Sequence, residues 1–306
     1  MEQSQLQTPV VMLIFNRPCV TRQVFEAVRK ARPEKLLVIA DGPRANRQED
    51  YDLCAGARGI FDDVDWPCTV EKNFAEANLG CMRRVSSGLD WAFERVEEAI
   101  ILEDDCLPAA TFFPYCTELL DRYRDDPRIA QISGVNFLFG RHKISYSYYF
   151  SRYNQAWGWA TWRRAWLCND NAMELWPAFR SEGGLSKLIK DQRVVQYWTD
   201  VLDQVMAANI DSWACRWSLA CLRQEMLTLI PSVNLVSNIG FGEDATHTTE
   251  DESHLLANVP TEEMVFPLAH PAMVVPDCIA DGITERIMFR HPSILTKLFR
   301  FLRSCL

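Results

Sequence analysis

Three adjacent carboxylates, Glu103, Asp104 and Asp105, are the residues whose types and spacing most directly suggest chemistry. They follow an apolar run at residues 100–102 that is typical of a buried strand. Because neighbouring carboxylates are costly to bury without a partner, a positive group must meet them. Hard oxygen ligands suit Mg2+ or Mn2+, and either cation can also bind phosphate oxygens. A solvated turn is the alternative explanation, but the position directly after a strand favours a divalent-metal site.

Two more polar residues stand directly after apolar runs of the sequence. Arg17 follows the run at residues 10–15, and Asp41 follows the run at residues 36–40. Each has an ordinary explanation, since Arg17 can cap a helix and Asp-Gly-Pro is common turn chemistry. Ligands of open α/β sheets, however, bind outside the carboxyl ends of the strands. The shared placement of both residues with the acidic triplet therefore predicts a nucleotide site.

Asp211 and His247 are candidates from the second half of the chain. Asp211 opens a helical pattern with Ser212 and Trp213, so it is either a helix N-cap or a general base beside an aromatic wall. The sequence does not separate these two roles. His247 follows a segment with glycines at residues 240 and 242, and it is either a surface residue or a late metal or phosphate contact.

Tryptophan is concentrated in one part of the chain. Eight of the ten tryptophans fall between Trp157 and Trp217. Such a cluster can be hydrophobic core, but aromatic faces are also good platforms for the C–H groups of a sugar.

The elements that must position these residues alternate between apolar runs and helical patterns. Continuous apolar runs are expected for strands that are buried on both faces of a parallel sheet. Strands are predicted at residues 10–15, 36–40, 68–71, 99–102 and 129–133, and helices at residues 21–30, 83–93 and 111–123. Strands that alternate with helices predict an α/β fold with a doubly wound, mostly parallel sheet.

Composition excludes several classes of protein. A net charge of −9 over 306 residues argues against a nucleic-acid partner. The eleven cysteines are odd in number and form no CxxC pair, so we expect them to be reduced packing residues. No GxGxxG follows the first strand, which argues against a dinucleotide-dependent oxidoreductase. The polar N-terminus and the lack of a run of roughly 18 apolar residues predict a cytoplasmic protein.

The C-terminal residues have a different charge pattern. After Glu285 there is no acidic residue, whereas five arginine and lysine residues follow. Apolar residues recur at helical spacing within residues 291–306, so this segment is predicted to be a basic amphipathic helix. Such a helix binds an anionic membrane surface, or else it packs on the protein or on a partner. The first alternative predicts a peripheral location on the inner face of the cell membrane.

Taken together, these residues resemble the GT-A nucleotide-sugar transferases, and most closely the N-acetylglucosaminyltransferase I family, over roughly residues 10 to 250. Asn16-Arg17-Pro18 is similar to the family's first-strand segment, whose arginine helps to bind the nucleotide. Asp41 stands where the family has its uracil-recognising aspartate. The triplet at residues 103–105 is similar to the family's DxD-type site, which implies Asp105 as the direct metal ligand, with Glu103 also at the metal and Asp104 at the nucleotide.

The resemblance continues on the acceptor side. Trp157-Gly158-Trp159 with Leu175-Trp176-Pro177 resembles the family's Gly-Trp and Trp-Pro segments, and Asp211-Ser212-Trp213 resembles its Asp-Asp-Trp segment. This implies Asp211 as the catalytic base and an acceptor surface that includes Trp157, Trp159 and Trp213. The spacing between Trp176 and Asp211 is longer than in the family.

Two further donor contacts follow from the same resemblance. Residues 238–242 with His247 resemble the family's flexible loop over the donor, which implies His247 at the metal. Arg83 or Arg84 stands near the position of the family's donor-contacting histidine, so one of them is expected at the nucleotide.

The resemblance implies a GT-A fold and a metal-dependent, inverting glycosyltransferase. Its donor would be a nucleotide-diphosphate sugar, and specifically a UDP-sugar such as UDP-GlcNAc. Its acceptor would be a glycan or a lipid-linked glycan, and its cofactor would be Mn2+ or Mg2+. Residues 1–140 would form the nucleotide-sugar-binding half, residues 141–285 the acceptor-binding and catalytic half of the same compact domain, and residues 286–306 the C-terminal helix. The alternatives are a sugar nucleotidyltransferase and a non-catalytic nucleotide- or glycan-binding protein of the same fold.

Overall fold

The computed structural model describes residues 5–241 and 256–289. His247 and the predicted helix at residues 291–306 lie outside the described residues. Within the described part, none of the helices is both long enough and apolar enough to cross a membrane.

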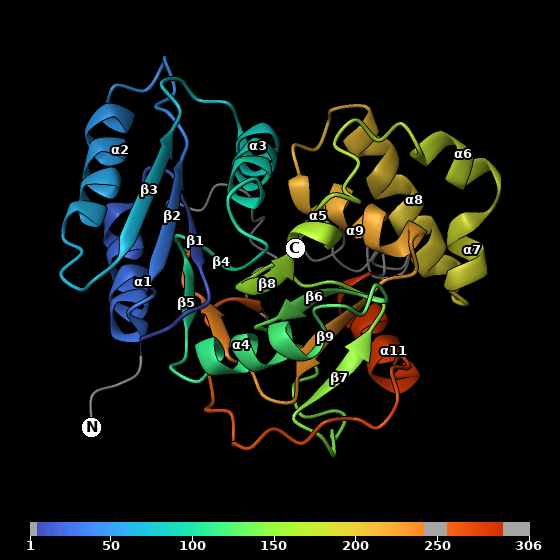
Figure 1. The fold of residues 1–306 in the computed structure, drawn as a ribbon. Helices are drawn as coiled ribbons and strands as arrows, with labels where there is room; N and C mark the ends of the chain where they lie inside the picture. Colours follow the sequence, from blue (N-terminus) through green and yellow to red (C-terminus); the bar gives the residue numbers. More distant parts are fainter. Residues whose placement is uncertain (1–4, 242–255, 290–306) are drawn as a thin grey trace, which may run out of the picture.

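One eight-stranded sheet runs through the molecule in the order β3-β2-β1-β4-β8-β6-β9-β7 (Figure 1). Its strands are β1 (Val10–Ile14), β2 (Lys35–Ala40), β3 (Thr69–Phe74), β4 (Glu98–Glu103), β6 (Ile129–Ser133), β7 (Tyr148–Ser151), β8 (Trp159–Trp162) and β9 (Leu227–Pro231). The first four strands are parallel to one another, whereas β8 is antiparallel to β4 and β6. β9 is parallel to β6, and β7 is antiparallel to β9.

Helices cover both faces of the sheet because its strands bury alternate side chains on opposite sides. Val10 and Met12 of β1 belong to the core with α1 (Pro18–Ala31), α2 (Glu49–Gly59) and α4 (Phe112–Arg122). Val11 and Leu13 belong to the core with α3 (Cys81–Phe93), α5 (Arg163–Trp166) and α9 (Trp213–Arg223). The prediction of an α/β fold with a doubly wound, mostly parallel sheet is therefore confirmed.

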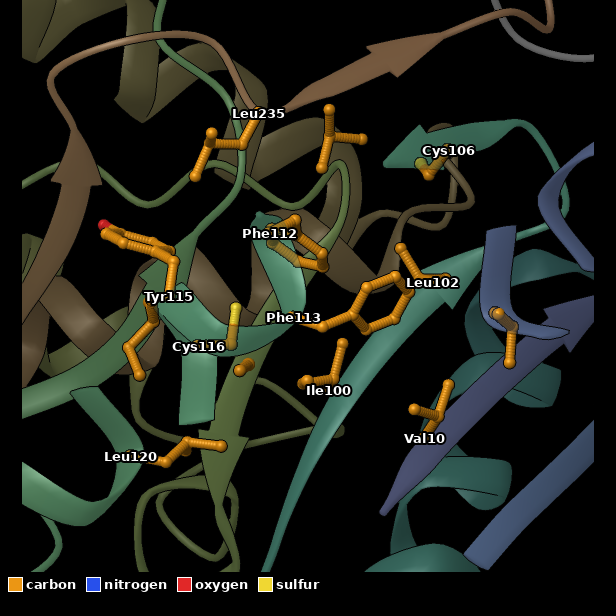
Figure 2. Packing of buried hydrophobic residues seen from close by; sticks show 14 of the residues in the cluster. Val10, Ile100, Leu102, Cys106, Phe112, Phe113, Tyr115, Cys116, Leu120 and Leu235 are labelled. Carbon is orange, nitrogen blue, oxygen red and sulfur yellow. The ribbon is translucent and has the colours of Figure 1, made fainter. Parts of the chain in front are cut away.

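Helix α4 fixes the middle of the sheet from one face. The ring of Phe113 faces the side chains of Ile100 and Leu102 on β4 (Figure 2). All three side chains are almost completely buried. This packing holds β4 in place directly before the acidic triplet.

The remaining elements lie beyond the antiparallel half of the sheet. The helices α6 (Trp176–Ser181), α7 (Gly184–Leu188) and α8 (Gln192–Met206) gather at the end remote from α1 and α2 (Figure 1). The last described helix is α11 (Cys278–Met288), which packs beside β7. A short antiparallel pair of β5 (Cys106–Pro108) and β10 (Val236–Asn238) follows the acidic triplet.

Candidate functional site

A cavity of about 290 Å³ opens at the carboxyl ends of the parallel strands β1, β2 and β4. This is the edge of an open α/β sheet at which ligands bind, and the volume is near the lower end of the range for small-molecule sites. The cavity brings together residues that are distant in the sequence. Among the predicted site residues, it is lined by Arg17, Asp41, Arg84, Glu103, Asp104 and Asp211.

Arg17 pairs with two carboxylates of the acidic triplet. Its Nη2 donates to Asp104 and, at 2.9 Å, to Oδ2 of Asp105. Asp104 also accepts a hydrogen bond from the backbone N–H of Phe15 at 3.3 Å. Arg17 therefore neither caps a helix with its side chain nor points at free solvent, because its charge is committed to the triplet.

The triplet carries more negative charge than Arg17 neutralises. Burial, followed by the neighbouring carboxylates of Asp105 and Asp104, raises the pKa of Glu103. Burial also raises the pKa of Asp104 although Arg17 opposes the shift. Within the described chain, Glu103 has no hydrogen-bond donor to its carboxylate. Uptake of a proton or binding of a further cation would relieve the repulsion between these carboxylates.

Cys81, at the start of α3, lies close to several carboxylates of the site. Burial, together with the carboxylates of Glu103, Asp211 and Asp41, raises the pKa of its thiol to about 12. Carboxylates from three separate segments of the chain therefore surround one end of the cavity.

Asp41 is a structural anchor for the loop that leads into α3. Its Oδ1 accepts from the backbone N–H groups of Gly42 and Leu79, at 2.8 and 2.9 Å. Its Oδ2 accepts from Nδ2 of Asn78 at 3.0 Å and from the backbone N–H of Gly80 at 3.1 Å. A carboxylate has about four lone-pair sites, and all are used here. The prediction that Asp41 reads the nucleotide base is at odds with this geometry.

Replacing Asp41 by asparagine is expected to lower the free energy of unfolding by about 2–4 kcal/mol. The amide keeps one acceptor oxygen, but its NH2 group would face buried N–H donors. Urea denaturation measures the change. Asp65→Asn is the matched control, because Asp65 is exposed and pairs with Arg29 on the surface, and it should change the unfolding free energy little. Equal effects of the two substitutions would contradict the anchoring role.

The two arginines predicted near the nucleotide differ in placement. Arg84 lines the cavity, but its guanidinium donates to the backbone oxygen of Ala40 at 3.0 Å and to Asn73 at 2.6 and 2.8 Å. It thereby ties the ends of β2 and β3 together. Arg83 is exposed and is not among the residues that line the cavity.

Asp211 stands at the rim of the cavity and does not cap α9. The cap of that helix is Ser212, whose hydroxyl accepts from the backbone N–H of Cys215. The interpretation of Asp211 as an N-cap of its own helix is therefore wrong. Its Oδ1 instead accepts from the backbone N–H of Met82 at 3.3 Å, in the first turn of α3. Gly80, the N-cap residue of α3, has no side chain to do this.

Two of the three predicted acceptor tryptophans are hydrophobic core. Trp159 is completely buried and stacks on Trp213, with ring centroids 5.6 Å apart and an interplanar angle of 20°. Both also pack in the cluster that contains Trp166 and Trp217. Neither Trp159 nor Trp213 can offer a ring face to a sugar, so the expectation for these two residues is corrected.

Trp157 is the acceptor candidate that keeps an accessible position. It is half-buried and lies edge-to-face against Phe241, with ring centroids 5.6 Å apart. The preceding Gly240 lies directly against Asp105, since a Cβ at Gly240 would be 2.1 Å from its Oδ2. Trp157 is thus close to the acidic triplet through the segment that follows β10.

The triplet fits a divalent cation that is completed by a substrate. Among residues 5–241 and 256–289, no three histidine, cysteine or carboxylate side chains converge on one metal position. Mg2+ is commonly bound by one or two carboxylates together with substrate phosphates rather than by a protein cage. Asp104 and Asp105 supply such a pair, and Glu103 directly precedes them on the chain.

Comparison with known proteins gives distant likenesses only. No protein-family model matches the chain, and no curated protein matches it. A mannosyltransferase from Pyrobaculum calidifontis, solved with GDP-Man and Mn2+, is 12% identical over 52% of this chain and 45% of its own, with a TM-score of 0.37. A UDP-glucose pyrophosphorylase, solved with UDP-glucose, is 11% identical over 47% of this chain and 62% of its own, with a TM-score of 0.28.

Both solved structures are of nucleotide-sugar enzymes, but the chain spans less than two thirds of either. At these TM-scores the likeness carries no argument about the site. The comparisons do not show the N-acetylglucosaminyltransferase I family, so that resemblance stays a prediction.

Sequence reasoning missed Arg44 as a lining residue of the cavity. Its guanidinium forms a two-point pair with the buried Asp50, at 2.6 and 2.9 Å, and lies 5.3 Å from the ring centre of Phe15. Arg44 holds the pKa of Asp50 well below its usual range. The position of Arg44, three residues after Asp41 and four after the end of β2, was the available indication, since it belongs to the same sheet edge.

Proposed function

We propose that this chain is a GT-A type glycosyltransferase that uses a nucleotide-diphosphate sugar as its donor. One observation carries the proposal: a cavity at the carboxyl ends of parallel strands is lined by Glu103 and Asp104, two residues of the acidic triplet, and also by Asp211. The triplet suits a metal-bound diphosphate, and a carboxylate at the rim suits an attacking hydroxyl.

The acidic triplet is assigned to the metal and the diphosphate. Asp105 would bind Mn2+ or Mg2+, with Asp104 and Glu103 contributing charge and with His247 as a further contact. When bound, the cation would neutralise the charge that develops on the departing diphosphate. Arg17 is close enough to the same place to contact phosphate oxygens once it leaves the carboxylates.

Asp211 is assigned as the general base for the acceptor hydroxyl. Its carboxylate accepts a hydrogen bond from the backbone N–H of Met82, and it lines the same cavity as Glu103. This placement favours glycosyl transfer over nucleotidyl transfer, because a sugar hydroxyl must lose a proton whereas an attacking sugar phosphate need not. Trp157 is the aromatic residue assigned to the acceptor side.

The finer features rest on the family resemblance. They are the inverting outcome, the choice of a UDP-sugar such as UDP-GlcNAc, and the glycan or lipid-linked acceptor. An anionic membrane surface bound through residues 291–306 would bring the enzyme to a lipid-linked acceptor, and this too is a proposal from the sequence.

A thermal-shift screen tests the donor site. UDP, GDP and CMP are each added with and without Mn2+, and one nucleotide class is expected to raise the melting temperature only when the metal is present. A ligand at a hundredfold excess over its dissociation constant stabilises the native state by about 2.7 kcal/mol. The corresponding nucleosides, which lack phosphate, are the control and should give no shift. If no nucleotide shifts the melting temperature under either condition, the proposal is wrong.

A further inference from the structure

Arg17 lies where a divalent cation would have to bind. One of its terminal nitrogens bonds both Asp104 and Asp105, and only 17% of its side chain is exposed. The backbone at Gly240 lies beside the contact of Arg17 with Asp105, since a Cβ there would lie 2.1 Å from Oδ2 of Asp105 and 2.7 Å from Nη1 of Arg17. Asp105 and the guanidinium of Arg17 are therefore both packed against the backbone of Gly240.

The other arginines that line the cavity are held by different partners. Arg84 bonds backbone oxygen atoms at the ends of β2 and β3, and Arg44 bonds Asp50. In the described part of the chain neither of these arginines forms an ion pair with the triplet, and Arg17 is the cation in direct contact with the proposed metal ligands. A divalent cation on Asp104 and Asp105 would be close to the positive charge of Arg17, and like charges repel at such distances.

We propose that Arg17 and the divalent cation exchange places on Asp104 and Asp105, and that a diphosphate ligand drives the exchange. The inference rests on the proposed function and adds the ligand class that the cavity accepts. The guanidinium fork matches phosphate oxygens, so Arg17 can move from the carboxylates to a phosphate without losing its charge partner. The cation also requires phosphate oxygens to complete its coordination.

A diphosphate satisfies both requirements at once, because one phosphate can bind the cation while the other accepts Arg17. A monophosphate can satisfy only one of them. The cavity should therefore discriminate between nucleoside diphosphates and monophosphates, and metal binding and diphosphate binding should strengthen each other by the same factor.

The first experiment measures Mn2+ binding alone, with no nucleotide present, from the electron paramagnetic resonance of the free ion. The wild-type protein should bind Mn2+ weakly, and Arg17→Gln should bind it about tenfold more tightly or better. Arg17→Lys keeps the charge but has no fork to join two carboxylates, so its affinity for Mn2+ should fall between those of the wild-type protein and Arg17→Gln. This variant also tests the inference if Arg17→Gln does not fold. Arg22→Gln is the control, since Arg22 is on α1, the helix that directly follows Arg17, and pairs with Asp63 at 2.7 Å.

The second experiment compares nucleotides of one base, UDP with UMP and GDP with GMP, by calorimetry at saturating Mn2+. The wild-type protein should prefer the diphosphate of the base that it accepts. Arg17→Gln should lose about tenfold or more of the diphosphate affinity and little of the monophosphate affinity. Arg22→Gln should match the wild-type protein.

The outcomes separate the inference from the proposed function. Equal Mn2+ affinity of the wild-type protein and Arg17→Gln overturns the exchange but leaves the glycosyltransferase proposal in place. Tighter Mn2+ binding with unchanged diphosphate affinity also overturns it, because Arg17 would then only balance the charge of the triplet. If no variant binds Mn2+ and no nucleotide binds, the proposed function fails and the inference fails with it.

Discussion

Replacing Asp105 by alanine is expected to abolish the Mn2+-dependent stabilisation by nucleotide and to lower turnover by about a thousandfold or more. A catalytic metal ion stabilises the transition state by several kcal/mol, and each 1.36 kcal/mol corresponds to a factor of ten in rate. Asp105 is largely buried beside Gly240 and bonds Arg17, so no neighbouring side chain can take its place without a rearrangement. Thermal shift with nucleotide, with and without Mn2+, measures the binding loss, and initial rates measure the turnover loss.

The stability of the unliganded protein distinguishes this loss from misfolding. Asp105→Asn keeps the shape of the side chain and removes one of three crowded negative charges. It should melt at or above the wild-type temperature and still show no metal-dependent shift. Asp121→Asn, in an exposed carboxylate on α4 that pairs with Arg124, is the matched control and should behave as the wild-type protein does. A metal-dependent nucleotide shift in Asp105→Asn would show that the metal ligand is elsewhere.

The parallel half of the fold could be predicted because its strands are apolar on both faces. The runs at residues 10–15, 36–40 and 99–102 correspond to β1, β2 and β4. Such runs are buried between two layers of helices, and few other environments would tolerate them. Once parallel strands are predicted, the polar residues at their carboxyl ends must share one edge, so the convergence of Arg17 and the acidic triplet follows from topology.

Of the antiparallel half, the sequence predicted the strand at residues 129–133, which is β6, but not β7, β8 or β9, because these strands carry an ambiguous pattern. β8, with the residues Trp159 to Trp162, is rich in aromatic side chains that suit both a core and a sugar-binding surface. The stacking of Trp159 on Trp213 joins segments that are more than fifty residues apart, and local periodicity contains no information about such a contact. The assignment of both residues to the acceptor failed for this reason.

The hydrogen-bond partners of the polar side chains are the other feature that could not be predicted from the sequence. Nothing in Asp41-Gly42-Pro43 indicates that the carboxylate of Asp41 is fully occupied by donors from Gly42 and from residues 78–80. The contact of Arg17 with the triplet likewise depends on side-chain directions rather than on residue order. The sequence could thus predict which groups meet, but it could not predict which of them are already satisfied.

Replacing Asp211 by asparagine is expected to lower the turnover number by about a hundredfold to ten-thousandfold, which is the usual contribution of a general base. Nucleotide binding should be unchanged. The amide oxygen can still accept from the backbone N–H of Met82, so the start of α3 should keep its position, whereas the amide cannot take a proton from an acceptor hydroxyl. The measurements are the turnover number with the best donor from the nucleotide screen and the metal-dependent thermal shift with its nucleotide.

Ser212→Ala is the control that separates chemistry from helix capping in this prediction. It removes the cap of α9 one residue away and should cost about 1 kcal/mol of stability, yet it should preserve turnover because Ser212 does not line the cavity.

If Asp211→Asn retains the wild-type rate, the base lies elsewhere, and Glu103 is the next candidate because its carboxylate faces the same cavity without a hydrogen-bond donor in the described chain. If Asp211→Asn instead loses nucleotide binding together with turnover, Asp211 acts by holding α3 and not as a base. A selective loss of turnover is the result that supports glycosyl transfer over nucleotidyl transfer, because only an attacking hydroxyl requires a base at this rim.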